Sequence, residues 1–298
     1  MGQLGYEVVN NDDGHLGCAS MSARQLSGRK ASSRADPILV ATASEAVLRA
    51  GATQRQYFRQ DVRVDKKGRI DLVTEVDLAI ERDFRAMIGE RFPDHAVLGE
   101  EFGEYVPTSS SASHCWVFDP IDGTVNYAHG LPIFCASLAL EINGTAVVAA
   151  VYDPMREELF TAERGEGARL NGRPLHVSKC DGLVDAMLCT GFPYDVHETV
   201  DEVIGLFGDF IGVARAVRRL GSAALDLCYV ADGRFDGFWE QRLHPWDMAA
   251  GALLVAEAGG TVSTLSGGQF SSRDGSIVAS NTHLHSLMLN RIDSRSSI

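Results

Sequence analysis

The sequence has no hydrophobic run long enough to cross a membrane. Its apolar stretches stay short of the ~18 residues that a membrane-spanning helix requires. The first residues, MGQLGYEVVNNDDG, have neither the basic start nor the apolar centre of a secretion signal. The sequence therefore predicts a cytoplasmic protein without a membrane partner.

Cysteine motifs are also missing. The six cysteines are irregularly spaced and none forms a CxxC pair: they are Cys18, Cys115, Cys135, Cys180, Cys189 and Cys228. Structural zinc sites and disulfide frameworks usually show regular cysteine spacings. We therefore expect reduced thiols, as is typical of cytosolic proteins.

Positive charge is scarce. The chain carries 27 Lys and Arg residues against 40 Asp and Glu, which gives a net charge of −13. Proteins that bind nucleic acid directly usually present a basic surface, so this class is disfavoured. The same negative charge would repel an anionic substrate unless a cation lies between them.

The composition is otherwise that of a globular protein. Hydrophobic residues make up 45% and charged residues 22% of the 298 residues, which is enough apolar material for a sizeable core. Residues 1–36 are rich in Ser, Arg and Gly without periodicity, which predicts a flexible tail. The remaining length suits two lobes, which we place at residues 37–175 and 176–298.

The pattern of elements predicts a mixed α/β (α+β) fold. Long helices are expected at 38–58 and 75–92, and the Asn143–Gly144 turn predicts a hairpin within 133–154. The second lobe alternates a helix at 221–233, a strand at 235–240 and a helix at 245–260. We expect the hairpin sheet to lie at the centre of the first lobe.

The segment VFDPIDGTVNY, residues 117–127, carries the strongest chemical signal. Asp119 and Asp122 flank a short turn after an apolar strand, so both carboxylates can face one point. Hard oxygen ligands of this kind suit Mg²⁺ or Mn²⁺. If a helix starts at Gly123–Thr124, its free N–H groups favour a phosphate. An ordinary strand-ending turn is the alternative.

Three further acidic positions accompany this segment. Glu100 and Glu101 follow an apolar strand in LGEEF, Asp77 opens a helix in DLVTEVD, and Asp247 lies just inside a helix in HPWDMAAG. Taken singly, each is also explained as a solvated loop acid or as a first-turn acid that complements a helix dipole. Converging carboxylates would repel each other and a phosphate unless divalent cations reverse the sign of the site.

Together these segments resemble the inositol monophosphatase family, within the lithium-sensitive Mg²⁺-dependent phosphatases. The resemblance covers roughly Pro37 to Arg291, and the sequence as a whole looks most like bacterial inositol-1-monophosphatases. It rests on DLVTEVD, LGEEF, WVFDPIDGTVNYAHGLP, GSAALDLCYVADGRFDGFWE and HPWDMAAGALLVAEAGG. It implies a layered α-β-α-β-α sandwich like that of fructose-1,6-bisphosphatase, a homodimer, and a metal-activated water that hydrolyses inositol monophosphate.

The resemblance also implies a role for each matching residue. Glu100, Asp119 and the Ile121 carbonyl would hold a first Mg²⁺, and Asp119, Asp122 and Asp247 a second. Glu100 would help to hold a weak third ion through water, with Mn²⁺ as a substitute metal and Li⁺ as an inhibitor. Asp77 and Thr124 would activate water, and the Gly123 and Thr124 N–H groups would bind phosphate. Asp122, Ala223 and Glu240 would contact the substrate, and Lys66 lies in a loop that bears on metal binding.

Several alternatives stay open at this point. Val125 departs from the commonest family pattern, where Thr often follows DGT, although a backbone role would survive the change. The alternative substrates are histidinol phosphate, fructose 1,6-bisphosphate and 3′-phosphoadenosine 5′-phosphate. The arginines at 215–219 could bind the second phosphate of a bisphosphate substrate. Some bacterial relatives also act with the transcription machinery, so a regulatory binding role is the alternative from another class.

Overall fold

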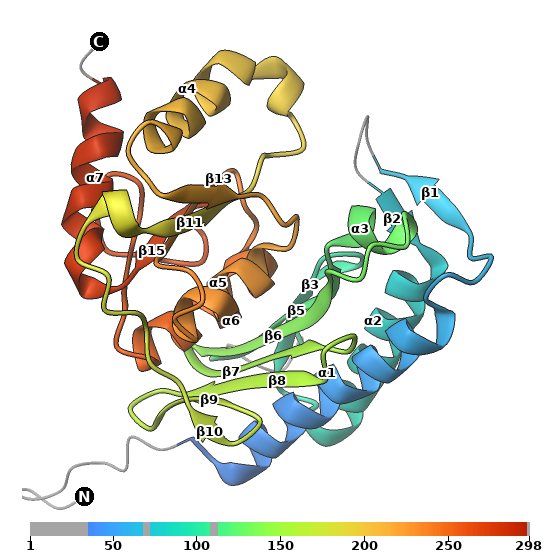
Figure 1. Ribbon diagram of the computed structural model, residues 1–298. Coiled ribbons are helices and arrows are strands. Elements are labelled where there is room, and N and C mark those ends of the chain that lie inside the picture. The colour runs from blue at the N-terminus through green and yellow to red at the C-terminus, as the bar shows by residue number, and fades with distance from the viewer. Residues whose placement is uncertain (1–34, 68–71, 108–112, 297–298) are drawn as a thin grey trace, which may run out of the picture. The chain divides into compact units, whose positions relative to one another are not determined.

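The computed structural model describes residues 35–67, 72–107 and 113–296 (Figure 1). The tail predicted at residues 1–36 lies almost wholly outside them, so its flexibility stays a prediction. No helix among the described residues is both long and apolar enough to span a lipid bilayer.

The larger of the two main sheets has eight strands. In spatial order they are β10 (Arg173–Pro174), β9 (Gly167–Leu170), β8 (Glu158–Glu163), β7 (Thr145–Asp153), β6 (Cys135–Ile142), β5 (His114–Asp122), β3 (Ala96–Gly99) and β4 (Gly103–Tyr105). Neighbours are antiparallel except β3 and β5, which run parallel. The predicted hairpin is confirmed, because β6 and β7 pair in the middle of this sheet and are joined at Asn143–Gly144.

The second sheet has five strands of mixed direction. In spatial order they are β12 (Ala216–Arg218), β11 (Met187–Thr190), β13 (Gly237–Gln241), β15 (Ser276–Ser280) and β14 (Thr261–Ser263). β11 runs parallel to both of its neighbours, and the other pairs are antiparallel. A separate ribbon pairs β1 (Val64–Lys66) with β2 (Leu72–Thr74).

The helices form three layers around these sheets (Figure 1). The outer pair on the eight-stranded sheet is α1 (Pro37–Tyr57) and α2 (Glu75–Arg91), the pair between the sheets is α5 (Ala223–Ala231) and α6 (Pro245–Glu257), and the pair on the far face of the second sheet is α4 (Val200–Ile211) and α7 (Thr282–Ser296). Three hydrophobic clusters fill the spaces between these layers, one for each pair of helices. The expected α-β-α-β-α sandwich is therefore confirmed.

Sequence periodicity explains how the helices pack. The helix predicted at 75–92 has an apolar stripe at helical spacing, which is buried along α2 at Val76, Ile80, Phe84, Met87 and Ile88. An apolar stripe on one face is enough for α2, because this helix packs against only one sheet. The almost uncharged α6 is instead buried on most sides from Met248 to Val255, as a helix between two sheets requires.

The core between the two sheets joins residues from both predicted lobes. Val117 and Phe160 of the first sheet belong to the same hydrophobic cluster as Phe238 and Ile277 of the second. Residues 34–298 form one compact unit. The division at 175/176 falls between β10 and β11, and as a domain boundary it stays a prediction.

Candidate active site

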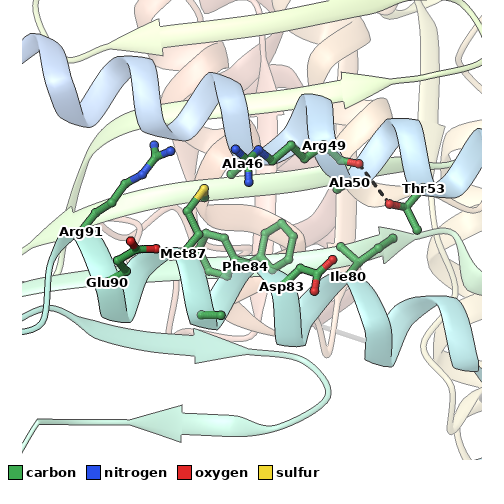
Figure 2. Close-up of a pocket in the computed structure, with 12 residues that line it drawn as sticks. Ala46, Arg49, Ala50, Thr53, Ile80, Asp83, Phe84, Met87, Glu90 and Arg91 are labelled. Carbon is green, nitrogen blue, oxygen red and sulfur yellow. Dashed lines mark hydrogen bonds between the residues drawn. The ribbon is translucent and has the colours of Figure 1, made fainter.

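A cavity of about 450 Å³ lies away from the predicted chemistry. It is found between α1 and α2, and its lining includes Arg49 of α1 and Phe84 and Met87 of α2 (Figure 2). Arg91 reaches across this gap and pairs with Glu45 at 2.6 Å. None of the predicted site residues lines this cavity. The site is therefore identified by its chemistry, in a smaller cavity of about 200 Å³ beyond the end of β5.

β5 runs through the whole DPID motif. The sequence predicts a turn between Asp119 and Asp122 after the strand, but β5 continues to Asp122 with a register shift against β6 between these two residues. In a regular strand, residues three apart point to opposite faces. An irregularity of this kind re-aims side chains and also tolerates a proline, which lacks an N–H group.

Two hydrogen bonds hold this irregular segment in place. The Asp119 Oδ1 atom accepts a bond from the Ile121 N–H at 2.9 Å. The fully buried Gln54 side chain of α1 donates to the Pro120 carbonyl at 2.7 Å. The conformation of the motif thus depends on a helix that lies far away in the sequence.

Three of the predicted metal ligands converge. Asp119, Asp122 and Asp247 each offer one carboxylate oxygen, and these oxygens lie within 4.8 Å of one another. Asp247 comes from the first turn of α6, where its Oδ2 atom accepts a bond from the His244 N–H at 2.6 Å. Ser137 of β6 donates to the Trp246 carbonyl at 3.3 Å and so ties the start of this helix to the sheet.

The other two predicted metal ligands line the same cavity but stand outside this group. Glu100 follows β3, and its Oε1 atom lies 2.9 Å from the Lys67 ammonium group. The Ile121 carbonyl accepts a hydrogen bond from the Thr124 hydroxyl at 2.9 Å. Both oxygens therefore have partners within the protein.

The Gly123–Thr124 step begins a helix, as the phosphate-binding interpretation required. The short helix α3 (Thr124–Ala128) starts directly after Gly123, whose φ angle is 98°. A Cβ atom at residue 123 would lie 2.9 Å from the Ile133 carbonyl oxygen, so both conformation and space demand glycine. The backbone can therefore approach a ligand closely at this position.

Asp77 lies beside Thr124, and it also caps its own helix. Its Oδ2 atom accepts bonds from the Thr74 N–H at 2.8 Å and the Thr74 hydroxyl at 2.5 Å. Its Oδ1 atom lies 3.4 Å from the Thr124 Oγ1 atom, which is a long hydrogen bond. The two interpretations of Asp77, a capping acid and a partner of Thr124, thus apply to different oxygens of one carboxylate.

A second pocket adjoins the carboxylates and contains the predicted substrate residues. Ala223 and Glu240 line it, and it shares Asp122, Gly123 and Asp247 with the metal cavity. The Asp122 Oδ2 atom faces this side and accepts bonds from the Ser222 hydroxyl at 2.6 Å and the Ala224 N–H at 2.7 Å. The start of α5 therefore fixes the carboxylate that both cavities share.

Several residues at the site were not identified from the sequence. The first is Lys67, which lines the metal cavity, whereas the predicted Lys66 ends β1 and is exposed. Residues 68–71 of that loop lie outside the described part of the chain.

The second is Glu81, which is fully buried on α2 and accepts bonds from the Glu101 N–H at 2.7 Å and the Phe102 N–H at 3.2 Å. It therefore positions the loop that carries Glu100.

That loop also depends on a glycine. A Cβ atom at Gly99 would lie 2.1 Å from the Glu81 Oε1 atom, so the carboxylate reaches the loop only because residue 99 has no side chain. Arg85 pairs with Glu81 at 2.8 Å and supplies the positive charge that a buried carboxylate needs. The helical spacing from Asp77 to Glu81 and Arg85 was the only signal in the sequence for this arrangement.

Comparison with known proteins identifies the family. The model of the inositol monophosphatase family matches residues 36–297. The chain belongs to this family. It is 46% identical over 241 residues to Nus factor SuhB of Pseudomonas aeruginosa, which covers 80% of this chain and 89% of that protein. It is 43% identical over 244 residues to the inositol-1-monophosphatase of Synechocystis, and the match covers 82% of this chain and 84% of that protein.

Solved structures of the family show the same fold. SuhB of Bartonella henselae superposes with a TM-score of 0.80 at 38% identity, which covers 86% of this chain and 98% of that one. The inositol monophosphatase of Anabaena has a TM-score of 0.78 at 38% identity, and the match covers 86% of this chain and 96% of that one. The expected fold is confirmed, and the acidic cluster is consistent with a metal-dependent member of the family.

Burial places the clustered carboxylates under strong electrostatic strain. Burial, followed by the charges of Glu100 and the other acids, raises the pKa of Asp119 well above its usual range. Burial likewise raises the pKa of Asp247, and the neighbouring Asp122 adds to this effect. Burial raises the pKa of Asp77 to about 7 and that of Glu240 to about 8. A bound cation would relieve this strain.

These shifts predict how the stability of the metal-free protein depends on pH. Because the folded-state pKa values of Asp77 and Glu240 are raised, the folded protein holds protons that the unfolded chain has released. Their stabilising contribution is complete below the ordinary carboxyl pKa of about 4 and is lost as pH rises through about 7 to 8.

We therefore expect the free energy of unfolding in EDTA to fall between pH 5 and pH 8. Each unit of pKa shift corresponds to about 1.4 kcal/mol, so the total decrease should reach a few kcal/mol. Urea denaturation at several pH values would measure it. Mg²⁺ should stabilise the protein most at the alkaline end, and stability that rises with pH in EDTA would contradict the assignment.

Proposed function

We propose that the chain is a Mg²⁺-dependent phosphomonoesterase that hydrolyses inositol monophosphate to inositol and phosphate. The observation that carries this proposal is the convergence of three carboxylates, two buried and one half-buried, beside a helix start and a Thr–Asp pair. Family membership and the inositol-1-monophosphatase relative support the same reaction.

The donor set fits a hard divalent cation. Asp119, Asp122 and Asp247 offer carboxylate oxygens, Glu100 offers another on the same cavity, and Ile121 offers a carbonyl. Oxygen donors without sulfur or nitrogen suit Mg²⁺ or Mn²⁺. When bound, the metal supplies charge neutralisation and a more acidic water. Without it the carboxylates would repel a phosphate dianion.

Thr124 and Asp77 are proposed to orient the attacking water and take its proton. Asp77 is held rigidly by Thr74, and its free oxygen faces the Thr124 hydroxyl. Burial raises its pKa to about 7 in the metal-free protein, and a cation in the cavity would lower this pKa, which leaves the carboxylate ionised and able to take a proton at neutral pH. The Thr124 hydroxyl links this carboxylate to the metal cavity that Thr124 lines.

The N–H groups of Gly123 and Thr124 are proposed to bind the phosphate. They lie at the start of α3, where backbone N–H groups are directed out of the helix. The glycine lets the phosphate oxygens come close to the backbone. Binding through the backbone also explains why Val125 is acceptable in place of a hydroxyl-bearing residue.

The adjoining pocket supports a leaving group rich in hydroxyls. Its described lining includes four carboxylates, Asp122, Asp226, Glu240 and Asp247, and two arginines, Arg219 and Arg242. Arg242 is already paired with Asp195. Of the arginines at 215–219, Arg219 reaches the pocket, where it lies over the Phe192 ring at 5.5 Å. A second phosphate would compete with these carboxyl groups for Arg219, whereas the hydroxyl groups of a polyol can donate hydrogen bonds to them.

A phosphate-release screen tests the proposal. With Mg²⁺ present, kcat/KM should be at least about tenfold higher for inositol 1-phosphate than for fructose 1,6-bisphosphate, histidinol phosphate or 3′-phosphoadenosine 5′-phosphate. Glu240→Gln should lower kcat/KM for inositol 1-phosphate by roughly tenfold, and should affect a simple aryl phosphate much less. A preference for a bisphosphate substrate would overturn the assignment of the leaving group.

A binding role in transcription is the second candidate. Relatives at 46% and 44% identity carry the name Nus factor SuhB, which favours it. A pull-down of RNA polymerase factors with the variant Asp119→Asn would separate this role from catalysis, because the variant keeps the surface and loses a metal ligand. A homodimer is likewise proposed from the family alone.

A further inference from the structure

The metal cavity already contains a cation that belongs to the chain. Among the described residues that line it, Lys67 is the one lysine or arginine. Its ammonium group lies 2.9 Å from Glu100 Oε1 and 2.5 Å from Glu101 Oε1. The Lys67 side chain is 25% exposed, and those of Glu100 and Glu101 are 14% and 3% exposed. The carboxylates of this ion pair are mostly shielded from solvent while the lysine is partly exposed, so its charges interact more strongly than those of a fully solvated pair.

We propose that Lys67 is a tethered cation that competes with the divalent metal for Glu100 and thereby sets the metal affinity of the site. The proposal rests on the metal dependence argued above. Glu100 lines the cavity and its Oε1 atom accepts from Lys67, so a metal ion that takes this oxygen must share or displace the ammonium group. A unit positive charge beside the cavity also repels a second cation.

The geometry makes displacement feasible. Lys67 enters the cavity from the end of the β1 strand, and its compact charge sits on a flexible four-carbon stem that can swing away. Glu101 lies next to Glu100 and gives the ammonium group a second partner, so Lys67 can release Glu100 without losing every interaction. Glu81 holds the loop backbone throughout.

Measuring metal affinity without turnover tests this proposal. Mn²⁺ binding to the intact chain, followed by the EPR signal of free Mn²⁺, should tighten about tenfold in Lys67→Met, a coupling of ordinary size between two linked sites. Lys67→Arg keeps the charge and should bind Mn²⁺ like the wild type. Lys179→Met is the matched control, because it removes an exposed lysine that does not line the metal cavity.

Reciprocal coupling gives a second readout. If the metal displaces the ammonium group, Mn²⁺ should raise the rate at which Lys67 is acetylated by a small anhydride, whereas the rate at the exposed Lys179 should stay constant. Mass spectrometry of the two peptides that carry these lysines measures both rates in one digest.

The outcomes separate this proposal from the proposed function. Unchanged or weaker Mn²⁺ binding in Lys67→Met, with normal binding in the wild type, would overturn the competing-cation role and leave metal dependence intact. Weaker binding would show that Lys67 instead supports Glu100. If the wild type binds no Mn²⁺ at millimolar concentration, both the role of Lys67 and the metal-dependent function are wrong.

Discussion

Chelation of divalent metal is expected to stop phosphate release almost completely, and added Mg²⁺ is expected to restore it. Asp119, Asp122 and Asp247 offer oxygens within 4.8 Å of one another, and a phosphate monoester brings nearly two more negative charges. One pair of like charges at ~4 Å costs roughly 4 kcal/mol at an effective dielectric of 20. That alone corresponds to about 10³-fold in rate. Phosphate release in EDTA, before and after Mg²⁺ is added, measures the effect.

A substitution checks that the effect arises at this site. Asp119→Asn keeps the size of the side chain and removes the carboxylate that both proposed metal ions are expected to share, so its turnover in saturating Mg²⁺ should approach that of the chelated enzyme. Asp61→Asn is the control, because Asp61 is exposed in the connection between α1 and β1. Full turnover in EDTA, or normal activity of Asp119→Asn, would contradict the whole metal-dependent mechanism.

The elements predicted best are those whose signals are local. Helix α2 is specified by an apolar stripe at helical spacing, and α5 by its cap, where the Ser222 hydroxyl accepts a bond from the Leu225 N–H at 3.4 Å. The β6–β7 hairpin follows from Asn143–Gly144, a dipeptide that suits the turn between two strands. Each of these signals acts within a few residues, so the sequence alone suffices.

The DPID segment shows where local signals fail. Asp and Pro normally end a strand, yet β5 continues to Asp122 because strand pairing with β6 and a bond from Gln54 of α1 hold the irregular segment. Neither partner is near in sequence. The irregularity is nevertheless what lets Asp119 and Asp122 converge, since a regular strand would direct them to opposite faces.

The acidic residues of the site were easier to predict than the residues that hold them in place. Acidic residues in four distinctive segments pointed to one site, and three of these residues, Asp119, Asp122 and Asp247, do converge. Ser222 and Lys67 are ordinary polar residues that reach Asp122 and Glu100 only through tertiary contacts. No spacing rule distinguishes Lys67 from Lys66, and only the fold shows which of the two lines the metal cavity.

Removal of the Thr124 hydroxyl is expected to lower kcat by roughly 10²-fold or more, as for the loss of general base catalysis. Thr124→Ala keeps every proposed metal ligand and both backbone N–H groups, so KM and Mn²⁺ affinity should stay near the wild-type values. Asp77→Asn should have the same effect, because an amide still fits beside Thr74 but cannot take a proton. Steady-state kinetics with inositol 1-phosphate, together with Mn²⁺ titration, measures both.

The double variant tests whether the two residues act as one unit. The Thr124 hydroxyl lies 3.4 Å from Asp77 and 2.9 Å from the Ile121 carbonyl, so it bonds to Asp77 productively only when the carbonyl has another partner. Thr124→Ser retains the hydroxyl and should keep most of the activity. If Thr124 acts through Asp77, the double variant should be little slower than either single variant, because the second change removes nothing further. Fully additive losses would mean that Thr124 serves the Ile121 carbonyl rather than the water, and the proposed base pair would then be wrong.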